Sequence, residues 1–383
     1  MAADSGGKRS VCFDVSNSYA LASFELLNEV RPGDMLVPAP LDVSNETATL
    51  LAMLPVDLSQ DLDQLTLSLS DIVLDKGRTP HAWVGGKRIL LGGGGRLVDS
   101  SEIDSIVDQL GGFGSDNRAG LERQLHRISA FRNRESEIIG LTMRVGRHIS
   151  GNSHIISDLL FADTTASILF LGEPGSGKTT IVREATRLLA ERTNVCIVDT
   201  SNEIAGDGDI PHPCVGFARR MMVTSLNKQS AVMIECVQNH TPEIMVIDEI
   251  GRNTEVEAAR TCKNRGVRLI ASAHGDLRKL IKNPQIRGLI GGVESVTLGD
   301  AQAKLEAKRK NINGNVSKVK AERAGAPIFD VIVELQRGQH HTWRVVRNTT
   351  DAVDRILDGQ QYLAERRIRD PASGTIQFEF EMA

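Results

Sequence analysis

The sequence has few aromatic residues, few cysteines and no long hydrophobic run. Phe, Trp and Tyr make up 4% of the 383 residues. No apolar stretch approaches the roughly 18 residues that a membrane-spanning helix requires. An odd number of cysteines without a Cys-x-x-Cys pair predicts reduced thiols and argues against a zinc site or a disulfide framework. The five are Cys12, Cys196, Cys214, Cys236 and Cys262.

A large excess of charge of either sign is also absent. The net charge is -4, so the molecule as a whole is not a polybasic nucleic-acid binder, and any basic surface must be local. A hydrophobic content of 40% and a charged content of 25% are typical of soluble globular proteins. The length favours two or three domains. Residues 1–20 lack the apolar core of a signal peptide and are not rich in arginine, and we expect them to be flexible.

One motif dominates what is present. Residues 172–179 read Gly-Glu-Pro-Gly-Ser-Gly-Lys-Thr and fit the P-loop pattern Gly-x-x-x-x-Gly-Lys-[Ser/Thr]. The apolar run 167–171 predicts a buried strand before the motif, and residues 181–190 predict a helix after it. We therefore expect a loop that binds the phosphates of ATP or ADP. Its residues are Gly172, Glu173, Pro174, Gly175, Ser176, Gly177, Lys178, Thr179 and Thr180.

The residue types in this loop suit phosphate binding. Glycines such as Gly175 and Gly177 let backbone N–H groups approach an anion closely, and the helix dipole that follows adds to the attraction. Lys178 would reach the β- and γ-phosphates, and the Thr179 hydroxyl would bind Mg²⁺.

Two acidic residues follow a second buried strand. Residues 244–247 are apolar and lead into Asp248 and Glu249. Asp248 would hold Mg²⁺ through water, and Glu249 would polarise the attacking water. Glu203, which follows the strand at 195–199, is the other candidate for that catalytic role. We favour Glu249 because it lies directly beside Asp248.

Further candidates follow neighbouring strands. The strand at 269–273 leads to His274, and either Ser272 or His274 could contact the γ-phosphate, the alternative being a structural histidine. Arginines at 219, 220 and 252 lie where a neighbouring subunit's nucleotide could be reached. The alternative is that Arg219, Arg220 and Arg252 pair with local carboxylates.

Two segments are basic. In the segment 118–147, the spacing of Leu121, Leu125 and Ile128 predicts one face of a helix, with Arg123 and Arg127 on another. Its arginines suit a solvated or ion-paired face, a subunit contact, a surface near the nucleotide or a polyanion contact. The segment 301–326 has no apolar periodicity and predicts an exposed loop, with a polyanion contact as the alternative.

These motifs together resemble the Ycf ATPases of plastids and cyanobacteria, first catalogued as a hypothetical chloroplast reading frame. Those proteins are relatives of the stage III sporulation ATPase, SpoIIIAA. The resemblance covers roughly residues 25–360. Besides the P-loop, it rests on segments 116–120, 125–129, 132–134, 140–142, 239–243, 248–251, 273–275, 283–284, 291–293 and 297–300.

The resemblance implies an α/β fold, with a RecA-like (ASCE) P-loop ATPase core and a smaller α+β N-terminal domain. The corresponding domain limits are 1–20 for the flexible N-terminus, 21–148 for the N-terminal domain, 149–360 for the ATPase domain and 361–383 for a C-terminal tail. Because ring ATPases of the secretion type are relatives, it also implies self-association, with a hexamer expected.

The function we expect is a Mg²⁺-dependent ATPase that couples hydrolysis to domain movement on a macromolecular partner. Two alternatives are a translocase or remodeller of single-stranded nucleic acid and a nucleotide-switched assembly factor with little turnover. We expect a soluble protein of the plastid stroma or of a bacterial-type cytoplasm, with an unidentified protein or weakly bound nucleic acid as partner.

Two features differ from the resembled family. Many of its members carry a C-terminal nucleic-acid module with Arg-x-x-x-His spacing, and no such module is evident here. The segment 337–341 has that spacing but falls in the turn of a predicted hairpin between strands at 329–335 and 343–346. The connection 304–326 is longer than the family's usual one. We therefore expect nucleic-acid binding that is weak and salt-sensitive.

Overall fold

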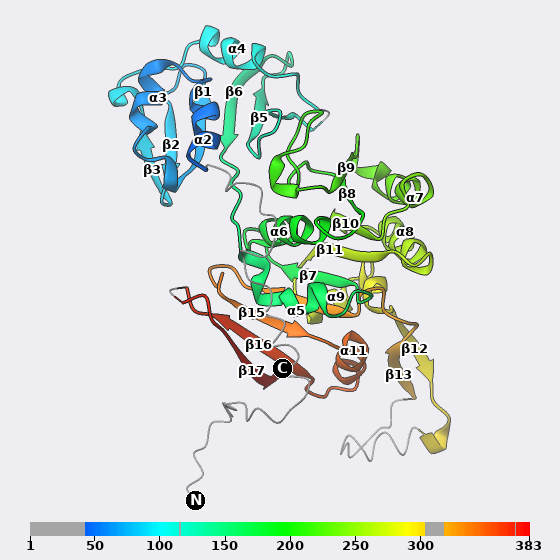
Figure 1. Cartoon of the computed structure of the whole chain (residues 1–383). Coiled ribbons are helices and arrows are strands. Elements are labelled where there is room, and N and C mark those ends of the chain that lie inside the picture. Colours follow the sequence, from blue (N-terminus) through cyan, green and yellow to red (C-terminus); the bar gives the residue numbers. More distant parts are fainter. Residues whose placement is uncertain (1–42, 115, 303–317, 372) are drawn as a thin grey trace, which may run out of the picture.

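The fold is built on two large β-sheets. A computed structural model describes residues 43–114, 116–302, 318–371 and 373–383. The strands pair into a six-stranded sheet and a nine-stranded sheet. Figure 1 shows the first in the upper part of the molecule and the second in the body below it. A separate two-stranded hairpin projects from the body near its base. None of the helices in these residues is long and apolar enough to cross a membrane.

The six-stranded sheet has the order β3-β2-β1-β6-β5-β4, and all its neighbouring strands are antiparallel. One face is apolar and packs against three helices, whose leucines and isoleucines share a core with alternate residues of the strands. The elements are α2 (Val43–Leu51), α3 (Val56–Leu62), β1 (Leu69–Asp75), β2 (His81–Val84), β3 (Lys87–Leu90), α4 (Ser100–Asp108), β4 (Arg118–Gly120), β5 (Arg127–Arg132) and β6 (Ile138–Arg144).

The nine-stranded sheet has the order β17-β16-β15-β14-β7-β11-β10-β8-β9. Its six strands from β14 to β9 are parallel, and the last three strands of the chain extend it as an antiparallel meander. The strands are β7 (Ile168–Gly172), β8 (Val195–Asp199), β9 (Arg219–Met222), β10 (Ile244–Glu249), β11 (Arg268–His274), β14 (Val331–Leu335), β15 (Thr342–Val346), β16 (Leu363–Arg369) and β17 (Ile376–Met382).

This order confirms the expected fold class. The P-loop strand β7 and the acidic strand β10 are separated by the interposed strand β11, which is the arrangement of a RecA-like (ASCE) core. The parallel strands β7, β8 and β14 are buried along their whole length, as expected for a sheet covered on both faces.

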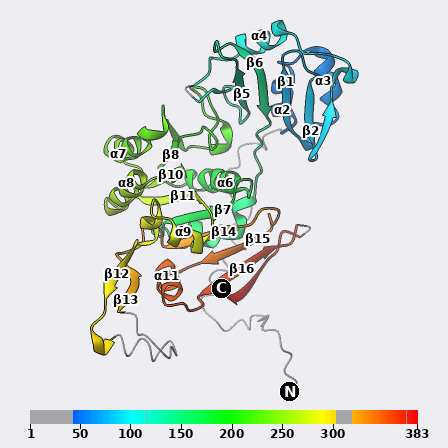
Figure 2. The same cartoon turned by 180° about the vertical axis from the view of Figure 1, so that it is seen from behind.

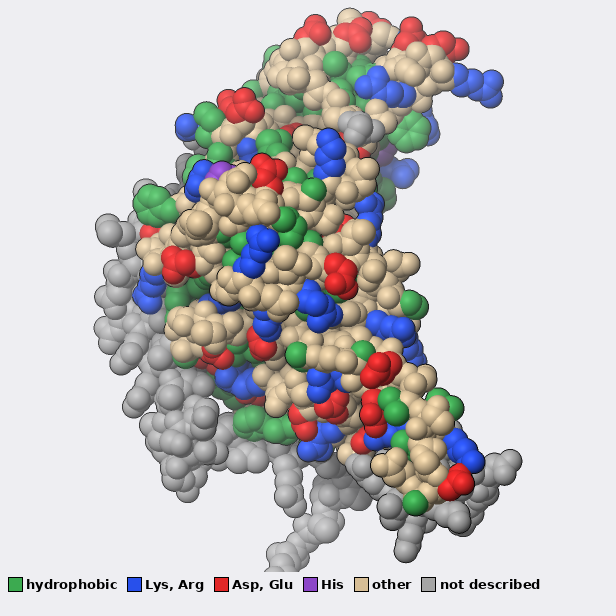
Figure 3. Space-filling model, turned by 90° about the vertical axis from the view of Figure 1, so that its right-hand side faces the viewer, with side chains coloured by type: hydrophobic (Ala, Val, Ile, Leu, Met, Phe, Trp, Pro, Cys, Tyr) green, Lys and Arg blue, Asp and Glu red, His purple; other side chains and the backbone are tan. Residues whose placement is uncertain are grey.

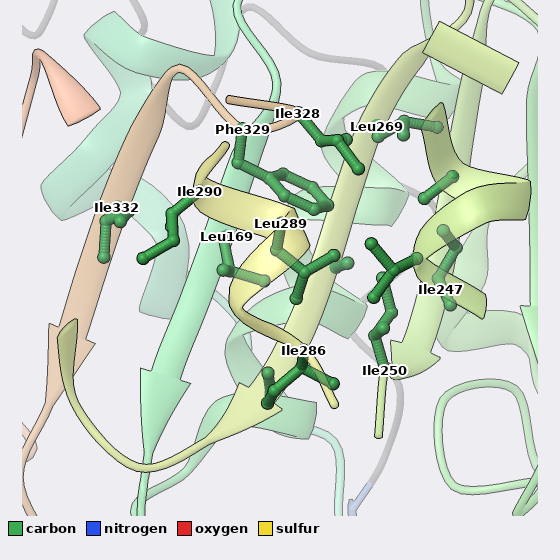
Figure 4. Packing of buried hydrophobic residues seen from close by; sticks show 14 of the residues in the cluster. Leu169, Ile247, Ile250, Leu269, Ile286, Leu289, Ile290, Ile328, Phe329 and Ile332 are labelled. Carbon is green, nitrogen blue, oxygen red and sulfur yellow. The ribbon is translucent and has the colours of Figure 1, made fainter. Parts of the chain in front are cut away.

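Helices cover both faces of this sheet, as the two opposite views in Figures 1 and 2 show. On one face lie α5 (Ser157–Phe161) and α6 (Lys178–Ala190). The helices of the other face are α7 (Gln229–His240), α8 (Asn253–Asn264), α9 (Leu277–Lys282) and α11 (Thr349–Leu357). Figure 4 shows the core of that face, where Phe329 and Leu289 pack over Leu169 and Leu269 of adjacent strands.

The helix predicted from Leu121, Leu125 and Ile128 is wrong. Arg127–Arg132 is strand β5, and the residues before it form an irregular connection. Gly120 and the positive φ of Arg123 interrupt any helix there, and from Arg127 onward half-buried residues alternate with the core residue Ile128. Three apolar residues at helical spacing were too few to decide between the two structures.

Two further segments differ in detail from the sequence-based expectation. Within 301–326, Val319–Arg323 forms strand β13 and pairs with β12 (Val293–Thr297), while residues 303–317 lie outside the described residues. The residues expected as a C-terminal tail contain β16 and β17, which are full members of the nine-stranded sheet. The expected flexible segment 1–20 also lies outside the described residues, and the domain limits stay a prediction.

Candidate nucleotide-binding site

The P-loop connects the end of β7 to the start of α6. Gly175 and Gly177 have φ values of 76° and 92°, a region that side-chain-bearing residues rarely adopt. At Gly172, a Cβ would come within 2.4 Å of Ser176 Oγ and 2.9 Å of the Leu335 carbonyl oxygen. The motif's glycines are therefore required by the geometry of the loop. Helix α6 directs its N-terminal N–H groups toward the loop.

Lys178 is folded against the loop. Its Nζ donates to the carbonyl oxygens of Gly172 at 2.8 Å and Glu173 at 3.1 Å, and lies 3.5 Å from His274 Nδ1. The side chain is almost wholly buried, and burial lowers the pKa of Lys178 although the nearby Glu249, Asp248 and Glu203 oppose that shift. A buried ammonium beside the loop is a suitable counter-charge for a phosphate.

Two buried carboxylates lie at the ends of the neighbouring strands. Asp199 accepts hydrogen bonds from the backbone N–H groups of Glu203, Ile204 and Ala205, which fixes the loop after β8. Burial raises the pKa of Asp199 to about 6. Burial, followed by the negative charges of Asp199, Glu203 and Glu249, raises the pKa of Asp248 well above its ordinary value. This group of acids would be stabilised by a cation.

The donor set fits Mg²⁺. The Asp248 carboxylate and the Thr179 hydroxyl supply hard oxygen ligands, which Mg²⁺ prefers. Among the described residues, no three His, Cys, Asp or Glu side chains are grouped closely enough to form an all-protein metal cage. Mg²⁺ commonly uses one or two protein ligands and completes its shell with water and phosphate oxygens.

Glu249 and His274 are in contact across neighbouring strands. The distance from His274 Nε2 to Glu249 Oε1 is 2.8 Å, and both side chains are about half exposed. His274 lies opposite Gly172 in the register of β11 and β7, so its other ring nitrogen faces Lys178. Ser272 is buried and its hydroxyl donates to the Asp248 carbonyl oxygen. Of the two candidates for a γ-phosphate contact, only His274 is accessible.

Glu203 connects the P-loop to the six-stranded sheet. Its Oε2 lies 3.4 Å from Thr179 Oγ1, and its Oε1 lies 2.7 Å from Arg127 Nη1 of strand β5. Arg127 is held near this site through a direct contact between the two sheets. Of the four roles that the sequence left open for the basic segment, the structure shows Arg127 in an ion pair, and that pair lies beside Thr179 of the P-loop.

A cleft lies between the two sheets beside Thr179. It encloses about 1140 Å³, and its lining includes Arg127, Arg144, Arg183, Glu203 and Arg252. Figure 3 shows the molecule hollowed between its upper part and its body, with Lys and Arg side chains along the hollow. Within the described structure, buried oxygens of three side chains near the P-loop or cleft have no hydrogen-bond partner. These are Ser176 Oγ, Thr200 Oγ1 and Asn202 Oδ1. Such atoms suit a polar ligand.

The three arginines considered for action on a neighbouring subunit differ in their surroundings. Arg220 donates to the carbonyl oxygens of Gly206 and Gly208, so it holds its own loop. Arg252 is exposed and faces the cleft of its own chain. Arg219 is exposed on the edge strand β9 and is in register with Cys196, whereas Arg220 is in register with Ile197. Adjacent strand residues point to opposite faces, as expected.

Two further residues lie near the P-loop, at a position that their sequence context did not predict. Arg337 and His340 belong to the turn between β14 and β15, and Leu335 of β14 pairs with Gly172. Arg337 Nε lies 3.8 Å from where a Cβ of Gly175 would stand, and His340 Nδ1 lies 3.9 Å from that of Gly177. The segment with Arg-x-x-x-His spacing is therefore a hairpin turn, as predicted, and it lies beside the P-loop.

Three curated relatives share much of the sequence. Protein ycf45 of Porphyra purpurea is 45% identical over 334 residues, which cover 86% of this chain and 57% of that protein. Protein SEEDLING PLASTID DEVELOPMENT 1 of Arabidopsis thaliana is 47% identical over 311 residues, 79% of this chain and 42% of that protein. The chain thus spans about half the length of these two relatives.

A shorter relative is matched over most of its length. Protein ycf45 of Cyanidium caldarium is 42% identical over 296 residues, which cover 76% of this chain and 84% of that protein. The family model described as Sporulation stage III, protein AA matches residues 130–299, the part that contains the P-loop and both acidic strand ends. The chain is 42% identical to the Cyanidium protein over most of that protein's length, and it has a RecA-like core and an intact P-loop. It therefore belongs to the ycf45 family, which is related to stage III sporulation protein AA.

Proposed function

We propose that the chain is a Mg²⁺-dependent ATPase. The observation that carries the proposal is the convergence of Lys178, Thr179, Asp248 and Glu249 at one edge of a RecA-like sheet. The P-loop backbone and Lys178 would hold the β- and γ-phosphates. Thr179 and Asp248 would hold Mg²⁺, which when bound neutralises charge on the phosphates.

Glu249 is the proposed general base. Its carboxylate is half exposed and can accept the proton of a water that attacks the γ-phosphate. His274 would orient that carboxylate through the 2.8 Å contact, and Lys178 would approach the phosphates from beside the His274 ring. Arg337 and His340, in the turn after the neighbouring strand β14, lie close enough to the loop to contact the phosphates.

Arg127 and Glu203 would transmit the nucleotide's state to the six-stranded sheet. Thr179, a proposed Mg²⁺ ligand, contacts Glu203, and Glu203 contacts Arg127. A change in the coordination of Thr179 on hydrolysis would therefore alter the contact that joins the two sheets. We propose that this contact couples hydrolysis to domain movement, with domain limits at 21–148 and 149–360.

We further propose that the chain works as a homo-oligomer, with a hexamer expected, in a plastid. Arg219 is exposed on the sheet's edge strand, where it can reach a neighbouring copy's nucleotide. The plastid proposal is supported by the name of the Arabidopsis relative. Immunodetection of the protein in fractionated plastids tests the location, and light scattering with and without ATP tests the assembly.

The function is tested by comparing phosphate release with nucleotide binding for Glu249→Gln. We expect the variant to bind ATP with Mg²⁺ as the parent does and to release phosphate at least about a hundredfold more slowly, since general-base catalysis contributes roughly that much. Glu257→Gln on the exposed surface of α8 is the matched control. A parent protein that binds ATP but never releases phosphate would favour a nucleotide-switched assembly factor.

A further inference from the structure

The second face of the six-stranded sheet is open. Alternate residues of each strand point away from the core, and none of these outward side chains in the described structure is buried. The exposed fraction is 68% for Phe131 and 55% for Leu90. The face therefore offers a surface that the described helices leave accessible.

Side chains form a row across this face. The register of the strands aligns one residue from each of five neighbours: Arg88, Trp83, Asp71, Arg144 and Arg127. Arg88 lies 5.1 Å from the centre of the Trp83 ring, so a planar cation and a large ring lie together at one end. The other end reaches the cleft, because Arg127 and Arg144 belong to its lining.

A shallow hollow of about 360 Å³ lies in the middle of the face. Trp83, Val73 and Thr142 are among its lining residues. Phe131 stands on the same face, opposite Gly140, and the carboxylate of Asp75 lies over that glycine. Trp83 and Phe131 are separated by three strand spacings, roughly 14 Å across the sheet.

We propose that this face, defined by Trp83, Phe131, Arg88, Arg118 and Arg144, binds single-stranded nucleic acid. Unpaired bases present flat faces that stack on aromatic rings and on guanidinium planes. Arg144, on a strand between the two rings, and Arg88 and Arg118, on the strands outside them, would contact the phosphates. A duplex hides its base faces and is therefore the poorer ligand. A chain of net charge -4 can bind a polyanion only through a local basic surface, and the arginines of this sheet face supply one.

The arginines of this face can exchange their present partners for phosphate. Arg144 lies 3.4 Å from Asp71 and Arg118 lies 3.5 Å from Asp116, and both are exposed surface pairs, which contribute little to stability. Burial, followed by repulsion from Arg144, lowers the pKa of Arg127, and Arg118 adds to this effect. A polyanion on the face would relieve that repulsion.

The test is fluorescence anisotropy with a labelled oligothymidylate of about 15 nucleotides, without added ATP. The result therefore does not depend on the proposed ATPase activity. We expect binding at low salt. The logarithm of the association constant should fall with the logarithm of the salt concentration with a slope of about -2, because each of three phosphate contacts contributes about 0.7. Trp83→Ala and Phe131→Ala should each weaken binding at least about fivefold. Trp83→Phe keeps an aromatic ring and should retain most of the affinity that Trp83→Ala loses. Arg144→Ala should make the salt dependence of binding less steep.

Matched controls lie outside the face. Phe217→Ala removes an equally exposed phenylalanine, and Arg355→Ala removes an exposed arginine of α11. Both should bind as the parent does, and thermal melting should show every variant folded. Absence of binding at low salt would overturn the proposal. Parent-like affinity in folded Trp83→Ala and Phe131→Ala, or equal competition by polyglutamate of the same charge, would overturn it as well.

Discussion

Arg127 and Glu203 are 76 positions apart in the sequence, yet Arg127 Nη1 lies 2.7 Å from Glu203 Oε1. The contact joins the six-stranded sheet to the loop after β8, within reach of Thr179. It makes a residue of the N-terminal sheet part of the surroundings of the P-loop.

Removing Arg127 should slow hydrolysis. Arg127→Ala leaves Glu203 without its partner beside Thr179, and we expect kcat to fall by roughly 10–100-fold, as for other residues that orient a metal ligand's surroundings. Steady-state phosphate release measures the effect. Arg132→Ala on the same strand is the control and should keep the parent's kcat. If Arg127→Ala hydrolyses ATP at the parent rate, Arg127 does not position the site.

The choice between the two candidate glutamates can be made by amide substitution. We expect Glu249→Gln to lose turnover, whereas Glu203→Gln should lose no more of it than Arg127→Ala does, because the amide oxygen can still accept hydrogen bonds from Arg127 and Thr179. Single-turnover hydrolysis separates this effect from product release. Loss of turnover in Glu203→Gln together with activity in Glu249→Gln would reverse the assignment.

Mixing two inactive variants tests whether Arg219 acts on a neighbouring subunit. Arg219→Ala subunits keep a complete P-loop, and Lys178→Ala subunits keep Arg219. The mixture should recover part of the parent's activity, because an intact Lys178 site then meets an intact arginine from the adjacent copy. Arg220→Ala is the contrasting variant, since Arg220 holds its own loop. Activity that is independent of concentration, with no recovery on mixing, would indicate a self-contained monomeric site.

Acid should destabilise the protein through Asp158. This buried residue of α5 is bonded to Arg367 of β16 at 2.6 Å. Burial acts to raise the pKa of Asp158, but Arg367 and then Arg347 outweigh it and hold the pKa below the ordinary 3.8. A carboxyl whose pKa is lower in the folded than in the unfolded protein stabilises the fold. This contribution is complete at pH values above the pKa of the unfolded state, and it is lost as the pH falls through the pKa of the folded state. The free energy of unfolding should therefore drop below about pH 4.

Asp158→Asn supplies the comparison for that pH dependence. The variant leaves the buried Arg367 with Glu365 as its remaining charge partner, and it should lose less stability at neutral pH than the roughly 3–5 kcal/mol that removal of a sole partner costs. Its unfolding free energy should fall less steeply than the parent's below about pH 4, as urea titrations at several pH values would show. Equal slopes would mean that Asp158 is not ionised in the folded protein.

Local patterns were sufficient to predict the P-loop core. The end of β7 is identified by the apolar run before Gly172 and by the glycines that need positive φ. The end of β10 is identified by the acids after residue 247. The positions of Arg127, Arg337 and His340 could not be predicted, because they depend on contacts between distant segments. The helix expected at 121–128 failed for a related reason, since cross-strand pairing with β6 outweighed a short apolar spacing.

The central claim is that Lys178 and its loop bind the phosphates of ATP, and calorimetric titration of ATP with Mg²⁺ into Lys178→Ala tests it most directly. Two charge-assisted contacts of about 1.5–3 kcal/mol each predict an affinity at least about a hundredfold below the parent's. Lys282→Ala, an exposed lysine of α9, should bind as the parent does. Unchanged affinity in a folded Lys178→Ala protein would contradict the account.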